Sequence, residues 1–131
     1  MNQFPVSLTP DFSKGRVMPK YLLVYHNAPY DMSSIAPEQM QEAMKLWNSW
    51  IGEGMQKGWM VDGGDGLLPD GRVIDSNKVV TDGPLAETKE IVGGYSIVQA
   101  DTYEQAVQCA MGCPILAEGG RVEVRQLAGL G

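Results

Sequence analysis

The sequence is poor in the residues that most often build metal and redox sites. It has two cysteines, Cys109 and Cys113, and a single histidine, His26. The cysteines are four residues apart, which places them on one face of a helix and fits neither a CxxC redox motif nor half of a zinc quartet. The carboxylates and the one histidine show no metal-ligand spacing. We therefore expect no metal and no cofactor, and two reduced, packed thiols, with a reactive thiol as the alternative.

Basic charge is also scarce. The chain has 10 Lys and Arg against 16 Asp and Glu, a net charge of -6, so its field repels phosphate backbones and anionic membrane surfaces. No apolar run approaches the roughly 20 residues that span a bilayer, and residues 1–17 lack a basic start followed by an apolar stretch. We expect no nucleic-acid partner, no membrane partner and a cytoplasmic location.

The length and composition suit one domain. With 131 residues, 44% of them hydrophobic, the chain can bury a continuous core without disulfides or structural metal. Residues 1–18 include Pro5, Pro10 and Gly15, and the stretch before Met18 shows neither helical nor strand periodicity. We expect a poorly ordered N-terminal extension over residues 1–18 and a domain over residues 19–131.

The hydrophobic periodicity predicts five strands and two helices. The strands are expected at residues 21–26, 59–67, 72–81, 91–99 and 121–127, and the helices from Pro37 to about Gly58 and from Asp101 to about Gly112. The turn at residues 69–71 should join the second and third strands in a hairpin, and the glycines of residues 63–66 predict a bulge. Asp101 and Glu104 are expected to form a capping box, and Pro114 to stop the second helix.

The first strand is apolar on both faces. Leu22 and Val24 point to one side, and Tyr21, Leu23 and Tyr25 point to the other. The predicted fold class is α+β, a split βαβ pattern with an added hairpin strand, in which two helices cover only one face of the sheet. A second subunit is the simplest cover for the other face, so we expect a homodimer. The alternative is a monomer whose loops and N-terminal stretch cover it.

The most distinctive local sequence is TDGPLAETKE at residues 81–90, followed by GGY at residues 93–95. Asp82, Gly83 and Pro84 favour a rigid turn, because the carboxylate accepts bonds from the following backbone, glycine adopts unusual dihedrals and proline fixes the chain direction. The segment resembles the DGPFAETKE signature of the DGPF branch of the YCII-related family, with Leu85 where phenylalanine is usual. Further similar segments extend the resemblance over about residues 19 to 127: the opening strand, Gly94 and Tyr95, Cys113 and Pro114, and VEVRQL at residues 122–127.

The resemblance implies a ferredoxin-like fold assembled as a dimeric α/β barrel. Many members are encoded near extracytoplasmic sigma factors, which implies a regulatory or accessory role for some. Another branch includes a chlorohydroxyhydroquinone dehydrochlorinase, for which a His and Asp pair is proposed as the catalytic centre, and the histidine of that pair lies near the start of the first helix. Residues 36–45 of this chain contain no histidine, and His26 lies instead at the end of the first strand.

These features predict a cleft near the DGP turn and the end of the first strand that binds a small organic molecule. We expect Asp82 to act as a base or an orienting carboxylate and His26 as its partner, in a cofactor-free lyase or isomerase reaction. The predicted ligand-binding residues are Tyr25, Glu87, Lys89 and Tyr95. Several alternatives stay open: Asp82 as a turn cap, His26 as a solvent-facing strand end, the tyrosines as core or interface residues, and the protein as a non-catalytic accessory module.

Overall fold

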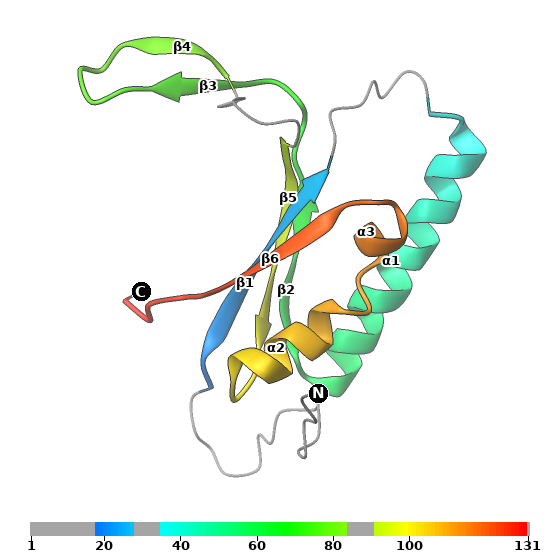
Figure 1. Ribbon diagram of the computed structural model, residues 1–131. Coiled ribbons are helices and arrows are strands. Elements are labelled where there is room, and N and C mark those ends of the chain that lie inside the picture. Colours follow the sequence, from blue (N-terminus) through cyan, green and yellow to red (C-terminus); the bar gives the residue numbers. More distant parts are fainter. Residues whose placement is uncertain (1–17, 28–34, 84–90, 131) are drawn as a thin grey trace.

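The protein has an α+β fold, as expected from the sequence. The computed structural model describes residues 18–27, 35–83 and 91–130 (Figure 1). Of the predicted extension at residues 1–18, only Met18 is described, and it is buried with 3% of its surface exposed. The elements are β1 Lys20–Asn27, α1 Pro37–Lys57, β2 Met60–Gly66, β3 Gly71–Ile74, β4 Val80–Gly83, β5 Ile91–Gln99, α2 Tyr103–Ala110, α3 Pro114–Ala117 and β6 Arg121–Gln126.

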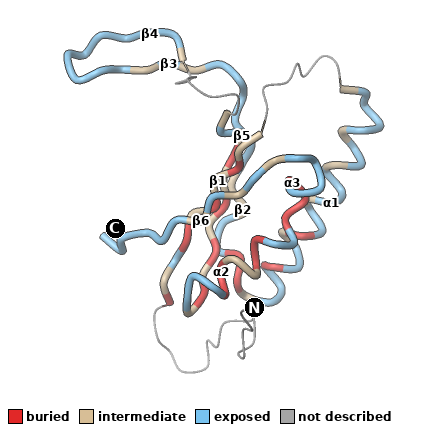
Figure 2. Tube along the Cα trace, in the orientation of Figure 1, coloured by how far each residue is buried: buried red, intermediate tan, exposed pale blue. Residues whose placement is uncertain are grey.

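Four strands form one antiparallel sheet in the order β2-β5-β1-β6, so β2 and β6 are its edge strands. The central pair, β1 and β5, aligns Tyr21 with Val98 and Leu23 with Ser96. Figure 1 shows the helices on one side of this sheet. The core lies between the helices and the sheet, as the distribution of buried residues in Figure 2 indicates.

Strand β1 alternates as predicted. Tyr21, Leu23 and Tyr25 are buried on the helix side, whereas Leu22 and Val24 are only half-buried. Residues directly opposite in neighbouring strands share a face, which puts the cross-strand partners of Leu22 and Val24 on the same side as these two residues. We call this surface the open face; it comprises Leu22 and Val24 with their partners Tyr95, Ile97, Glu123 and Arg125.

Helix α1 touches the sheet most closely near its C-terminal end. Gly54 is buried there, and a Cβ at this position would lie 2.8 Å from Met60 and from the Trp59 ring. The helix ends as predicted at Gly58, which has a left-handed φ of 87°. Apolar residues of α1 are not all buried, since Met44 and Met55 are 53% and 50% exposed. The close approach is therefore local, and other parts of the helix leave room against the sheet.

The predicted hairpin between residues 59–67 and 72–81 is wrong. Strand β2 pairs with β5, and residues 72–81 are not one strand, because β3 and β4 pair with each other in a separate two-stranded sheet. The turn between them is built by Asp75, whose Oδ1 accepts hydrogen bonds from the backbone N–H groups of Asn77 and Val79, and by Lys78 with a φ of 66°. An aspartate that bonds the following backbone ends a strand and starts a turn.

The start of the second helix is displaced by one residue from its predicted cap. The Thr102 hydroxyl accepts a hydrogen bond from the Gln105 backbone N–H, and the Gln105 side chain accepts one from the Asp101 backbone N–H. The N-cap is thus Thr102 rather than Asp101, because its hydroxyl accepts the bond from the third helical N–H, while the Gln105 side chain bonds the residue before the cap. The second helix ends before Gly112 and Pro114, as predicted, and Pro114 begins the short helix α3, which the sequence pattern did not predict.

Candidate functional site

A cavity of about 770 Å³ lies between α1 and the end of the sheet. This volume is within the range of about 300 to 1,000 Å³ that is usual for small-molecule sites. Its walls are formed by one side of α1, the end of β1, the glycine-rich parts of β2 and β5, and the residues around α3. The apolar and aromatic lining side chains are Ile35, Met40, Ala43, Met44, Trp47, Ile51 and Ile115.

Glycines form the sheet side of the cavity. Strand β2 shifts register twice against β5, as the predicted bulge requires, and Gly64 has a φ of +71° in this segment. A Cβ on Gly64 would overlap the Tyr95 carbonyl oxygen, and one on Gly93 would overlap the Asn27 side chain. Only glycine fits at Gly64, where the clash is with backbone, whereas a side chain at Gly93 would require Asn27 to move. The strands therefore contribute mainly backbone to this wall.

A chain of hydrogen bonds connects three strands beneath the cavity. The Tyr25 hydroxyl on β1 donates to Ser96 Oγ on β5 at 2.6 Å, and Ser96 Oγ donates to the Gly63 carbonyl oxygen on β2 at 2.7 Å. Burial raises the pKa of Tyr25 well above its ordinary value, so the phenol stays protonated and serves as a donor. The Tyr25 ring packs edge-on against Trp47, with ring centroids 5.0 Å apart. The bonds and the ring contact fix the position of this wall.

The polar side chains of the lining include two carboxylates. Trp47 Nε1 donates to Glu118 Oε2 at 3.3 Å, and Asp65 Oδ1 accepts a bond from the Gly66 backbone N–H at 2.8 Å. The described polar lining residues other than Tyr25 and Tyr95 are Asn27, Gln39, Asn48, Asp65 and Glu118. The charged groups in this described lining are thus anionic, and such a lining favours a ligand that donates hydrogen bonds.

Of the predicted ligand-binding residues, both tyrosines border the cavity. Tyr25 has its side chain on the helix side of β1, the side on which the cavity lies, and its hydroxyl bonds Ser96 there. Tyr95 lies between the buried residues Gly94 and Ser96, so strand alternation directs its ring toward the open face. The other two predicted residues, Glu87 and Lys89, lie outside the described residues.

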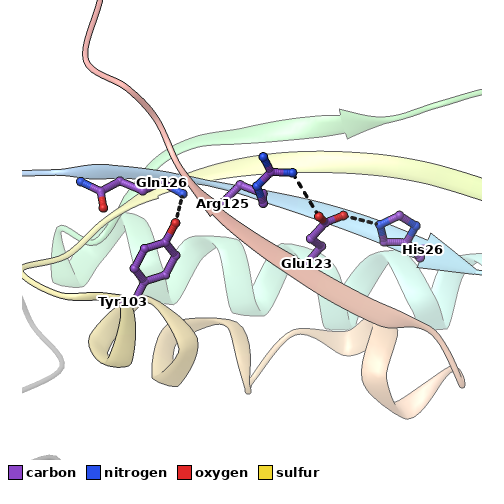
Figure 3. Close-up of polar contacts among 5 residues, drawn as sticks. All are labelled: His26, Tyr103, Glu123, Arg125 and Gln126. Atoms are coloured by element: carbon purple, nitrogen blue, oxygen red, sulfur yellow. Dashed lines mark hydrogen bonds and ion pairs between the residues drawn. The ribbon is translucent and has the colours of Figure 1, made fainter.

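His26 lies at the end of β1 but does not belong to the cavity lining. Its Nε2 is 2.9 Å from Glu123 Oε1, and Arg125 Nη1 is 3.3 Å from Glu123 Oε2 (Figure 3). The hydrogen bond from His26, followed by that from Arg125, lowers the pKa of Glu123. The carboxylate that holds His26 is therefore Glu123, a residue that the sequence pattern did not single out.

Asp82 lies on β4, away from the lining residues of the cavity. Its side chain is 94% exposed, and its Oδ1 is 3.7 Å from Arg72 Nε on the neighbouring strand β3. The contacts of Asp82 and of His26 are thus made with different residues, on different sheets. Within the described residues, the structure brings Tyr25 to the cavity and leaves both predicted acid-base residues outside its lining.

The two cysteines are expected to be chemically inert in the folded protein. Cys109 and Cys113 are 4% and 3% exposed, and burial raises the pKa of each thiol to about 11. Because the thiolate is the reactive form, a disulfide reagent near neutral pH should modify neither cysteine until the protein is unfolded. The raised pKa also means that stability declines as the pH rises from about 8.5, where unfolded thiols ionise, toward the folded value. Absorbance-monitored thiol titration with and without denaturant checks this, and rapid labelling of the folded chain would restore the reactive-thiol alternative.

Within residues 18–27, 35–83 and 91–130, no three or more His, Cys, Asp or Glu side chains are grouped as metal ligands. In the same part of the chain, no helix combines the length and apolarity needed to cross a bilayer. A search of curated proteins found no match to this chain. The family model of the YCII-related domain matches residues 20–128, a stretch that contains both the sheet and the cavity. The chain therefore belongs to the family of YCII-related domain proteins.

Proposed function

We propose that the protein binds a small organic molecule in the cavity between α1 and the sheet. The observation that carries this proposal is the cavity itself, about 770 Å³ in volume, with apolar walls and a few polar groups. Ligand sites typically combine an apolar enclosure with a small number of placed polar groups. The buried bonds from Tyr25 to Ser96 and from Ser96 to Gly63 hold one wall in place before any ligand arrives.

The lining favours a flat, largely apolar ligand with hydrogen-bond donors. Trp47 and the methionines Met40 and Met44 offer aromatic and polarisable contact surface. Asp65 and Glu118 accept hydrogen bonds and favour neutral or cationic groups over carboxylates. Phenols and aromatic amines fit this description better than short acids do.

We further propose that the chain is of the DGPF type and forms half of a dimeric, ferredoxin-like α/β barrel. The strand order β6-β1-β5-β2, with one long helix after β1 and another helix after β5, supports the ferredoxin-like arrangement. The half-buried Leu22 and Val24 of the open face support a second subunit. The cytoplasmic location stays a prediction from the sequence.

Ligand binding can be tested by isothermal titration of the purified protein with phenols, aromatic amines and matched aromatic carboxylates. Ala43 lines the cavity from α1, so Ala43→Trp should fill the space and weaken binding by about tenfold or more. Leu46→Trp introduces the same side chain on the same helix, at a residue that is 55% exposed and outside the lining, and should bind like the unmodified protein. An Ala43→Trp variant with unchanged affinity, or no binding of any compound, would overturn the proposal.

The same titrations address the predicted acid-base chemistry. Asp82→Asn and His26→Asn should leave ligand affinity unchanged, because neither residue lines the cavity. If a bound compound is converted to product, loss of turnover in both variants supports a lyase or isomerase. Saturable binding without product instead supports an accessory or regulatory module.

A further inference from the structure

The β3–β4 hairpin forms an arm that is separate from the body of the domain. We use "arm" for residues 71–83, which comprise both strands and the turn at Asp75. Among residues 18–27, 35–83 and 91–130, the two strands pair only with each other, and the arm's main packing contacts are between them. Figure 2 shows the arm exposed over most of its length. Because a lone two-stranded hairpin is marginally stable in water, this arm needs support from another surface.

One side of the arm carries an exposed apolar pair next to an ion pair. Ile74 and Val80 are directly opposite each other in the ladder, and they are 68% and 57% exposed. A neighbouring cross-strand pair on the same side joins Arg72 with Asp82. Val73, by contrast, faces the other side and is only half-exposed. An exposed pair of β-branched side chains beside an ion pair is typical of an interface between proteins rather than of a free surface.

The arm projects toward the side of the sheet that the helices leave uncovered. In Figure 1 the helices lie on one side of the four-stranded sheet, while the arm extends from its end toward the opposite side. That side carries the open face, with half-buried Leu22 and Val24. A protein seated on the open face would therefore also meet the arm. One partner can cover both exposed apolar surfaces.

We infer that the arm packs against a second copy of this chain and holds the dimer together. An isologous dimer covers the same patches on both subunits at once, so two arms and two open faces are buried by one contact. The charges of both surfaces favour a second copy of the chain as the partner. Basic and acidic residues are mixed on each of them: Arg72, Lys78, Asp75 and Asp82 on the arm, and Arg121, Glu123 and Arg125 on edge strand β6. Surfaces of mixed sign are self-complementary and do not select a nucleic acid or an anionic membrane. The inference rests on the proposed dimer and adds the element that clasps it.

The test is the monomer–dimer equilibrium measured by analytical ultracentrifugation. Ile74→Thr with Val80→Thr keeps β-branched side chains in the hairpin but removes its apolar contact surface, and should weaken dimerisation by about tenfold or more. A second variant, in which a short glycine-serine linker replaces residues 72–82, should weaken it further while leaving the circular dichroism of the body intact. Hydrogen exchange of the β3 and β4 amides in the unmodified protein should slow as the protein concentration rises.

The control variant is Leu46→Gln with Met111→Gln. These residues are 55% and 60% exposed on the helical side, so their substitution should leave dimerisation unchanged. If the unmodified protein dimerises and both arm variants dimerise equally well, the arm has no such role, while the dimer itself stands. If the unmodified protein is monomeric at all concentrations, the arm inference and the proposed dimer both fail.

Discussion

Gly64→Ala should lower the free energy of unfolding by about 3 kcal/mol or more. Gly64 has a φ of +71°, a backbone conformation that costs other residues energy, and its added Cβ would overlap the Tyr95 carbonyl oxygen on the neighbouring strand. Backbone cannot give way as a flexible side chain can. The variant must therefore separate β2 from β5 at the point where the two strands form one wall of the cavity.

Substitutions at two other glycines distinguish the two causes of this lost stability, which are the positive φ and the contact with Tyr95. Gly119 has a φ of +88° with open space around it, so Gly119→Ala should show the backbone strain alone, about 1 kcal/mol. Gly52 lies within α1, also in open space, and Gly52→Ala should raise stability by about 0.5 to 1 kcal/mol. Urea denaturation followed by circular dichroism measures all three. If Gly64→Ala and Gly119→Ala lower the free energy of unfolding by the same amount, the contact with Tyr95 contributes nothing to the loss.

Local signals in the sequence predicted most of the individual elements correctly. The bounds of α1 follow from Pro37 at its start and Gly58 after its end, and the bulge in β2 follows from its run of glycines. The assignment of β1 residues to the two faces of the sheet follows from alternation, because successive side chains of a strand point to opposite faces. These features depend on residues that are close together in the chain.

The pairing of the strands was predictable only in part. The turn at residues 69–71 favoured a hairpin with β2, but the turn at Asp75 is the one that the chain uses, because its carboxylate accepts two backbone bonds. Strand β2 pairs with β5 instead, across an intervening stretch of chain that includes the arm. Turn residues at two neighbouring sites do not by themselves indicate which pair of strands will meet.

The site was predicted less completely than the fold. Tyr25 was identified as a ligand-binding candidate, but Ser96, 71 residues away, was not, because their contact depends on the register between β1 and β5. Asn27 was missed for a similar reason, since only the three-dimensional structure shows its side chain against Gly93. Glu118 follows α3, a short helix that the hydrophobic periodicity did not predict. Single polar residues that lie far apart in the sequence form no periodic pattern, so the sequence does not indicate that they meet at one site.

Ser96→Ala should lower the free energy of unfolding by about 3 kcal/mol, more than expected for loss of one hydroxyl. Ser96 is fully buried and accepts from Tyr25 while donating to the Gly63 carbonyl oxygen. Its removal deprives the buried Tyr25 hydroxyl and the partly buried Gly63 carbonyl of this partner. Tyr25→Phe removes only the Tyr25 hydroxyl and leaves the bond from Ser96 to Gly63 in place. Its expected loss is smaller, about 1 kcal/mol.

The double variant measures the connection between the two residues. If the bonds act as one chain across β1, β5 and β2, the double variant should lose about 1 kcal/mol less unfolding free energy than the two single variants together. The reason is that the double variant has no Tyr25 hydroxyl left without a hydrogen-bond partner. Urea denaturation of all four proteins gives this coupling directly. Strictly additive losses would mean that the Tyr25 hydroxyl finds another partner when Ser96 is removed. The cavity wall would then be held in place by the packing of the Tyr25 ring against Trp47 rather than by the hydrogen bonds beneath it.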